Sequence, residues 1–144
     1  APRCHAAGVD HRLRVRSFPY LPAFLVGSLR AAGAAKNTTG NLAVSVLSDA
    51  NLAFWTRTLW VDEQSMRAFM FAPAHRPLMP KLLQWCDEAA VTHWLQDSSE
   101  PPPWPEVHRR LRQEGRTSRV NHPSTAQLSF EIPPPKTTRQ LTLK

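Results

Sequence analysis

The sequence of 144 residues predicts an α+β fold with the element order βαββαβ, the split β-α-β arrangement of ferredoxin-like domains. Three observations predict it. Short segments of alternating apolar and polar residues indicate half-buried strands, segments with apolar residues three and four apart indicate helices, and turn-forming residues separate the two. In such a fold one antiparallel sheet carries its helices on one face. A C-terminal helix and an extended tail follow this core.

The first strand and helix occupy the N-terminal quarter of the chain. Residues 12–18 alternate with period two, so that Leu13 and Val15 face the helices while the intervening arginines face the other side. Residues 20–35 form an apolar segment of helical length, and the turn formers of residues 36–40 end it.

Two further strands form a hairpin. Residues 41–48 and 53–60 alternate and are rich in β-forming residues, and the turn at residues 49–51 joins them. Alternation gives the second of these strands two distinct faces. One face carries Phe54, Thr56, Thr58 and Trp60, and the other carries Trp55, Arg57 and Leu59.

The second half of the core begins at Asp62, which has the properties of a helix N-cap, followed by Glu63 in the first turn. Pro73 and Pro77 bracket a break in this helical segment. The helix resumes from about residue 77 to residue 87, and residues 89–96 form the fourth strand, which places His93 on one face with two apolar neighbours.

The remaining chain is less regular because it is rich in proline. After Pro101–Pro103, residues 104–114 predict a short helix that ends at Gly115, and residues 127–132 predict an added strand. We therefore divide the chain into a leader (1–10), a ferredoxin-like core (11–97), a C-terminal helix with an extended segment (98–135) and a disordered tail (136–144).

The positive charge is concentrated late in the chain. Net charge is +7, and the last 44 residues carry 8 basic but only 3 acidic side chains. A basic tail can bind nucleic acid through phosphate contacts. Its arginines are not interleaved with stacking aromatic residues, however, so we expect nucleic acid not to be the main partner.

The chain lacks the sequence motifs of several classes of enzyme. The chain contains no glycine-rich phosphate loop, no His-Glu-x-x-His helix and no nucleophile elbow. Cys4 and Cys86 have neither metal spacing nor a disulfide framework, which predicts no metal site and a cytoplasmic location. The longest apolar run, residues 20–29, is interrupted by Pro22 and Gly27 and is too short to cross a membrane.

Residues 11–132 resemble the antibiotic-biosynthesis-monooxygenase-type superfamily of dimeric α+β barrels, and within it an uncharacterised branch related to spheroidene monooxygenase. The motifs that carry the resemblance are Phe54-Trp-Thr-Arg-Thr-Leu-Trp60, Met66-Arg-Ala-Phe69, Ala74-His75-Arg76, Trp85-Cys-Asp-Glu88, Val91-Thr-His-Trp94, Pro103-Trp104, Gly115-Arg116 and His122-Pro123-Ser124.

This resemblance implies a homodimer whose sheets pack face to face, with a pocket between the sheet and the helices of each protomer. Family activities include oxygenation of polycyclic substrates, heme degradation and heme-dependent carotenoid oxidation. The iron-ligating histidine of heme-degrading members falls at about Met79 here, and their heme-ruffling tryptophan falls near Phe69. Heme and no cofactor at all are therefore equal alternatives.

His75 is the candidate catalytic residue, because a neutral imidazole at a helix break can transfer a proton or ligate iron. Its structural alternative is a hydrogen bond that caps the break. Arg76 can bind a carboxylate, or form a surface ion pair. Further candidates for ligand binding are Trp55, Arg57, Trp60, Phe69 and His93, with core or interface packing as their alternative role.

The leading hypothesis is a monooxygenase-like protein, cofactor-free or heme-dependent, that binds a flat hydrophobic small molecule. A non-catalytic ligand-binding dimer and a nucleic-acid-binding protein that uses its basic tail are the alternatives. A homodimer is expected on physical grounds also, because an open sheet would leave the face of Trp55 uncovered. The sequence does not identify the substrate, and it does not show whether residues 116–144 cover the pocket.

Overall fold

The computed structural model describes residues 5–73 and 75–144. Residues 1–4, at the start of the predicted leader, and Ala74, in the predicted motif before His75, lie outside the described residues. The elements are β1 (Ala6–Val15), the 3-10 turn η1 (Phe18–Tyr20), α1 (Leu21–Lys36), β2 (Asn41–Ser48), β3 (Ala53–Trp60), α2 (Glu63–Met70), α3 (Leu78–Trp85), β4 (Cys86–Gln96), α4 (Trp104–Glu114), β5 (Arg116–Thr117), α5 (Thr125–Ser129) and β6 (Arg139–Thr142).

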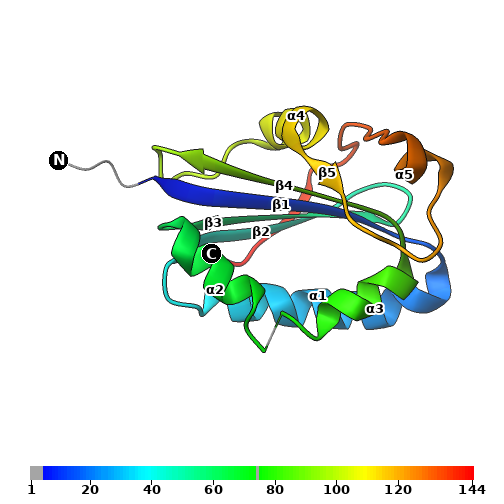
Figure 1. The fold of residues 1–144 in the computed structure, drawn as a ribbon, viewed down its shortest axis with the longest axis horizontal. Helices are drawn as coiled ribbons and strands as arrows, with labels where there is room; N and C mark the ends of the chain where they lie inside the picture. Colours follow the sequence, from blue (N-terminus) through cyan, green and yellow to red (C-terminus); the bar gives the residue numbers. More distant parts are fainter. Residues whose placement is uncertain (1–4, 74) are drawn as a thin grey trace.

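One antiparallel sheet organises these elements, in the order β5-β4-β1-β3-β2-β6. Its four central strands lie in the order β4-β1-β3-β2. Along the chain, α1 connects β1 to β2 and the α2–α3 pair connects β3 to β4, as the predicted ferredoxin-like fold requires. The fold class predicted from the sequence is thus confirmed. Helices α1, α2 and α3 cover one face of the sheet, and α4 and α5 lie on the other (Figure 1).

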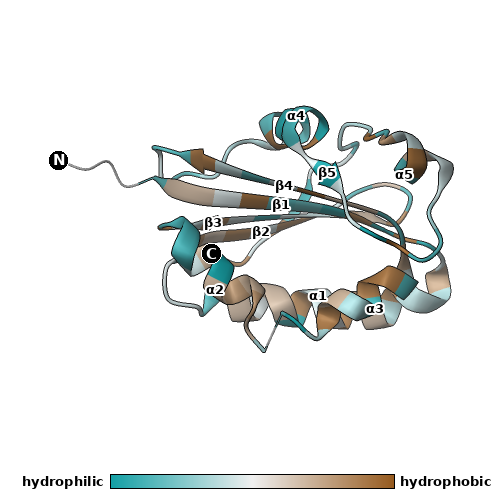
Figure 2. Ribbon diagram, in the orientation of Figure 1, coloured by the Kyte–Doolittle hydropathy of each residue, from teal (hydrophilic) through white to brown (hydrophobic). Residues whose placement is uncertain are grey.

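Each face of the sheet has its own core because side chains alternate along a strand. On the side of α1–α3, Val9, Trp60 and Phe69 belong to one buried cluster. On the side of α4, Trp55 and Leu111 belong to another. Helix α4 is largely hydrophilic (Figure 2) and buries only Val107 and Leu111, so it lies on the sheet with a narrow apolar stripe.

Local signals account for several boundaries. The Asp62 carboxylate accepts a hydrogen bond from the Ser65 N–H at 2.7 Å, which is the predicted N-cap of α2. Gly115 ends α4 as predicted, but its φ of −84° is ordinary. Glycine is required there for space instead, because a Cβ would collide with the Leu111 carbonyl.

Three segments differ from the sequence-based expectation. β1 begins at Ala6 rather than at Arg12, because Ala6 pairs with β4 and residues 7–10 pair with both β3 and β4. Residues 125–129 form a helix rather than a strand, since the Ser124 hydroxyl caps it by accepting from the Gln127 N–H. Residues 139–142 form an edge strand on β2 instead of a disordered tail.

Among the described residues, no helix combines the length and the apolar character needed to cross a lipid bilayer.

Candidate functional site

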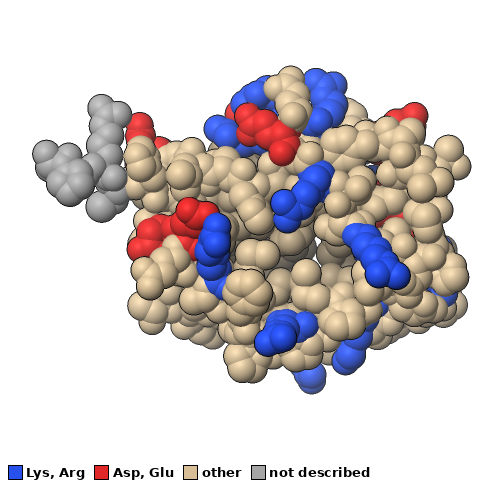
Figure 3. Space-filling model, in the orientation of Figure 1, with Lys and Arg blue, Asp and Glu red and all other residues tan. Residues whose placement is uncertain are grey.

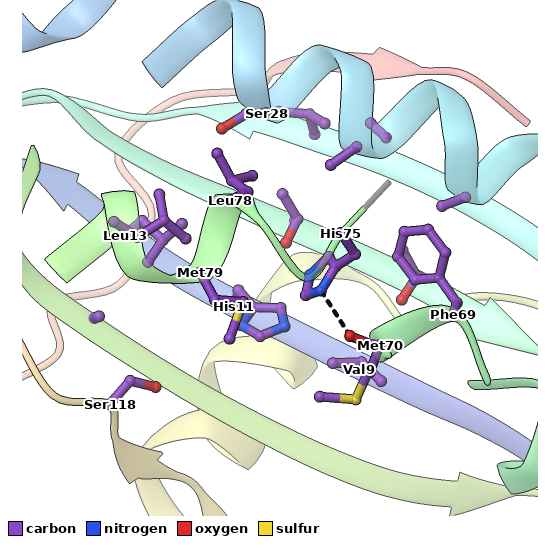
Figure 4. Close-up of a pocket in the computed structure, with 18 of the residues that line it drawn as sticks. Val9, His11, Leu13, Ser28, Phe69, Met70, His75, Leu78, Met79 and Ser118 are labelled. Atoms are coloured by element: carbon purple, nitrogen blue, oxygen red, sulfur yellow. Dashed lines mark hydrogen bonds between the residues drawn. The ribbon is translucent and has the colours of Figure 1, made fainter. Parts of the chain in front are cut away.

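A cavity of about 410 Å³ lies between the sheet and helices α1–α3 (Figure 4). β1, β2 and β3 form its floor, the three helices form its roof, and residues 118–120 lie at its side. Its ionisable side chains are His11, His75 and Arg119, and most of the other lining side chains are apolar.

Small side chains on α1 leave this space open. Ser28, Ala31, Ala32 and Ala35 all line the cavity. Their spacing of three and four residues places them on one face of the helix. Because none of them extends far from the backbone, α1 covers the sheet without filling the volume between them.

His75 enters the cavity from the break between α2 and α3. Its backbone N–H bonds to the Ala72 carbonyl at 3.0 Å, and its Nδ1 lies 3.3 Å from the Met70 carbonyl oxygen. A carbonyl only accepts, so Nδ1 carries the hydrogen and Nε2 keeps a lone pair. Burial lowers the pKa of His75, and the bond to Met70 opposes this shift.

His11 lies beside His75, with ring centroids 6.5 Å apart (Figure 4). It projects from β1 between Val9 and Leu13, which also line the cavity. Burial, with smaller contributions from His75 and His93, lowers its pKa to about 3. The imidazole is therefore uncharged at neutral pH and is able to donate or accept a hydrogen bond inside an apolar space.

His11 is a site residue that was missed at the level of the sequence, although the signal is present. The alternation that assigns Leu13 and Val15 to the helix-facing side assigns His11 to it as well. The alternating pattern predicts a strand that begins at Arg12, one residue after His11, whereas β1 begins at Ala6.

Two of the predicted aromatic residues form one wall of the cavity. Trp60 of β3 stacks on Phe69 of α2 with 5.2 Å between ring centroids and an interplanar angle of 28°. The Phe69 ring also lies 5.1 Å from the His75 ring. The Trp60 indole N–H donates to the Thr58 hydroxyl at 3.1 Å, so the tryptophan presents mainly its ring to the cavity.

Trp55 and Arg57, also predicted to bind ligand, lie on the opposite face of the sheet. The Trp55 indole N–H donates to the Asp49 carboxylate at 3.0 Å. The Arg57 guanidinium donates to the Pro102 carbonyl at 2.7 Å and lies 4.3 Å from the Trp104 ring centroid. These two residues do not line the cavity and instead hold the segment around α4 against the sheet.

The remaining two predicted residues lie outside the cavity lining. Arg76 is exposed, next to His75. His93 is exposed on β4, and it pairs in register with Val9, which does line the cavity. Burial lowers the pKa of His93, Arg116 and Arg67 lower it further, and Glu63 opposes them. The structure thus brings His75, Trp60 and Phe69 together, and leaves Arg76 and His93 outside.

No known protein-family profile matches the chain, and no curated protein matches it. Solved structures do. A conserved protein from Methanosarcina mazei superposes with a TM-score of 0.58 at 14% identity, covering 67% of this chain and 96% of that protein. SnoaB, a cofactor-independent oxygenase from Streptomyces nogalater solved in a mutant form, superposes with a TM-score of 0.53 at 17% identity, covering 68% and 97%.

An antibiotic biosynthesis monooxygenase superposes with a TM-score of 0.55 at 14% identity, covering 64% of this chain and 97% of that protein. The chain therefore shares the ferredoxin-like fold of these solved proteins, an antibiotic biosynthesis monooxygenase among them. Each of these matches includes nearly the whole of the other protein, and about a third of this chain lies outside it.

Proposed function

We propose that this protein binds a flat apolar small molecule in the cavity between the sheet and α1–α3, and that His75 accepts a proton from it. The observation that supports the proposal is the cavity itself, an apolar space of about 410 Å³ with two uncharged histidines side by side within it. A pocket that is mostly apolar and has a few convergent polar groups is the usual form of a small-molecule site.

The tautomer of His75 supports the direction of proton transfer. The Met70 carbonyl holds the hydrogen on Nδ1, so the lone pair of Nε2 is available to a ligand. His11 remains neutral and can hydrogen-bond to a carbonyl or hydroxyl oxygen of the same ligand. A carbanion or phenolate formed in this way would be a candidate for direct reaction with dioxygen. SnoaB, which shares this fold, is described as a cofactor-independent oxygenase.

Binding is tested by filling the cavity. Titration of the full chain with the fluorescent three-ring alcohol 9-anthracenemethanol should saturate at one site. Ala32→Trp, which places an indole inside the cavity, should abolish this binding, whereas Ala68→Trp on the exposed side of α2 should not. Equal binding by both variants would locate the ligand elsewhere on the molecule and refute the proposed site.

The chemistry is tested with an acidic three-ring ketone. Oxygen uptake with anthrone should be accelerated by the wild-type protein, and His75→Ala should reduce the rate by about 10²-fold, as expected for loss of a general base. His93→Ala is the matched control because His93 lies outside the cavity lining. Equal rates for the two variants would exclude His75 as the base.

Heme remains an alternative that the donor set allows. A histidine with a free Nε2 in an apolar pocket is a suitable iron ligand, and bound heme would supply one-electron and oxygen chemistry. A visible-absorbance titration with hemin decides between the two forms of the proposal. A saturable Soret shift that His75→Ala removes would favour heme, and no shift in the wild type would favour the cofactor-free form.

Non-catalytic binding is the second candidate function, and the low pKa of His11 favours it. A histidine with so low a pKa is a weak base at neutral pH, which fits ligand recognition by His11 better than proton transfer. Saturable binding of 9-anthracenemethanol without any oxygen uptake with anthrone would select this candidate.

The predicted homodimer needs a surface other than the face of Trp55. Val107 and Leu111 of α4, together with Ile132, cover Trp55 within the same chain. A face-to-face packing of two sheets would first have to displace this segment. We therefore expect the full chain to sediment as a monomer at micromolar concentration; a dimer at that concentration would show that α4 moves away or that another surface associates.

A further inference from the structure

The segment that follows α4 carries two arginines on the side of the sheet that holds the cavity. Arg119 lines the cavity next to Ser118. Arg116 pairs in register with Val91, whose side chain belongs to the core on the α1–α3 side, so Arg116 projects toward that side as well. On the face that carries β5, α2 and α3, basic side chains surround a hollow (Figure 3).

These two arginines differ from others nearby in having no acidic partner. Within the described part of the chain, neither guanidinium forms an ion pair or a hydrogen bond, and both are exposed. Arg109 and Arg110 on α4, by contrast, share Glu106. Two unneutralised cations three residues apart on this side of the sheet give it a positive potential.

The charges near Arg116 support the same conclusion. Burial lowers the pKa of His93, and the positive charges of Arg116 and Arg67 lower it further. Glu63 is the acidic group there, and its carboxylate already accepts a hydrogen bond from the Arg67 guanidinium at 2.9 Å. A ligand anion would therefore meet cations without an equal number of free carboxylates.

The arginine segment is also held in place. The Gln127 amide donates to the Ser118 carbonyl at 2.8 Å, and its oxygen accepts from the Ala89 N–H at 3.0 Å. The Ser118 N–H in turn donates to the Ala89 carbonyl at 2.8 Å. These bonds fasten residues 116–119 to the edge of β4, so the two guanidinium groups extend from a fixed backbone.

We propose that the ligand of this cavity carries an anionic substituent, such as a carboxylate, which Arg116 and Arg119 bind at the mouth while the apolar rings lie inside. This inference rests on the proposed binding function and specifies its ligand class. An anion inside the apolar cavity would lose its hydration without compensation, whereas at the mouth it keeps water and gains charge-assisted hydrogen bonds.

Two probes that differ in one group test this proposal. 9-Anthracenecarboxylate and 9-anthracenemethanol have the same three rings, and only the first is anionic. Both are titrated into the full-length wild-type protein, into Arg116→Ala/Arg119→Ala, and into Arg112→Ala/Arg139→Ala. The last variant loses the same charge at exposed arginines that do not line this cavity, one on α4 and one on β6.

The expected result is selective. Wild type should bind the carboxylate about tenfold more tightly than the alcohol, with the difference decreasing at high salt. Arg116→Ala/Arg119→Ala should lower the affinity for the carboxylate by about tenfold and change the affinity for the alcohol by less than about twofold. The control variant should leave both affinities within about twofold of wild type.

Three results would overturn the inference. Unchanged carboxylate binding in Arg116→Ala/Arg119→Ala, with the alcohol still bound, would refute the role of the arginines and leave the proposed function intact. Equal losses in both double variants would show a non-specific effect of net charge. If neither probe binds to the wild-type protein, both the proposed function and this inference are refuted.

Discussion

The two faces of the sheet are covered in opposite ways. On one face the small side chains of α1 leave a cavity that contains His11 and His75. On the other face, Leu111 of α4 and Trp55 of β3 belong to one cluster, and both side chains are fully buried. One sheet thus carries a tightly packed face and a face with an open cavity, because alternation along each strand separates the two sets of side chains.

The polar groups on the two faces differ as well. Asp10 lies on the α4 face, between Arg57 of β3 and Thr92 of β4 in register. It is fully buried, and neither carboxylate oxygen has a hydrogen-bond partner among the described residues. On the same face Arg12 donates to Glu88 at 2.9 Å. Charges on the α4 face are enclosed by packing, whereas the histidines on the other face adjoin open space.

The largest expected effect is a difference in packing energy between the faces. Leu111→Ala removes a fully buried side chain from the α4 face and should lower the free energy of unfolding by about 3 kcal/mol. Leu82→Ala, at the wall of the cavity, should cost only about 1 kcal/mol because Leu82 is partly exposed and already borders open space. Urea denaturation of both variants measures the difference, and equal costs would contradict the contrast between the faces.

Added volume tests the same contrast in the other direction. Gly8→Ala places a Cβ against the Trp94 ring on the α4 face, and should destabilise the protein by about 2 kcal/mol through overpacking. At Gly33→Ala on α1 the new Cβ meets no atom within 4 Å apart from its chain neighbours and its own helix backbone, and the change should stabilise the helix by about 0.5–1 kcal/mol. Thermal unfolding followed by circular dichroism should give shifts of opposite sign; a neutral Gly8→Ala would mean that Trp94 yields easily.

The sequence predicts the strand and helix segments of this core well where local chemistry determines them. Residues 41–48 and 53–60 have the boundaries in the structure that the alternation predicts, and Asp62 caps α2 as expected. The start of β1 is not predictable from local pattern. Its first residues, Ala6-Ala-Gly-Val-Asp10, contain weak β-formers, and only pairing with two neighbouring strands makes them a strand.

The candidate site was predicted less completely for a physical reason. Alternation divides β3 into a Trp60 face and a Trp55 face, but it does not indicate which face remains accessible to a ligand. That depends on α4, whose position on the sheet is set by contacts distant in sequence, such as Arg57 with Pro102 and Trp104. Trp60 therefore lies at the cavity as predicted, whereas Trp55 and Arg57 do not.

Asp10 should make the stability of the packed face depend on pH. Burial raises the pKa of Asp10, and Arg57 and Arg12 only partly oppose this effect. Because the folded pKa lies above the unfolded one, stability is greatest at acid pH and decreases as pH rises from the unfolded pKa of about 3.9 through the folded pKa. Asp10→Asn should stabilise the protein at pH 7 by about 1–2 kcal/mol, and the gain should shrink toward about pH 4. An Asp10→Asn variant that is less stable than the wild type would show that the buried Arg57 guanidinium needs the negative charge of Asp10.

His11 should give the cavity face a pH dependence of the opposite sign. Its pKa falls from 6.5 to about 3 on folding, so below about pH 6.5 the unfolded chain takes up a proton that the folded chain does not. Stability is therefore complete at neutral pH and is lost as pH falls.

Because the His11 side chain is partly exposed, we expect a loss of only about 1 kcal/mol between about pH 7 and pH 5. His75 and His93 shift in the same direction, so the comparison is between wild type and His11→Gln, which should lose less stability over that range. Chemical denaturation at the two pH values provides the measurement. Parallel losses in the two proteins would mean that His11 is solvated and that the cavity is wetter than its apolar walls suggest.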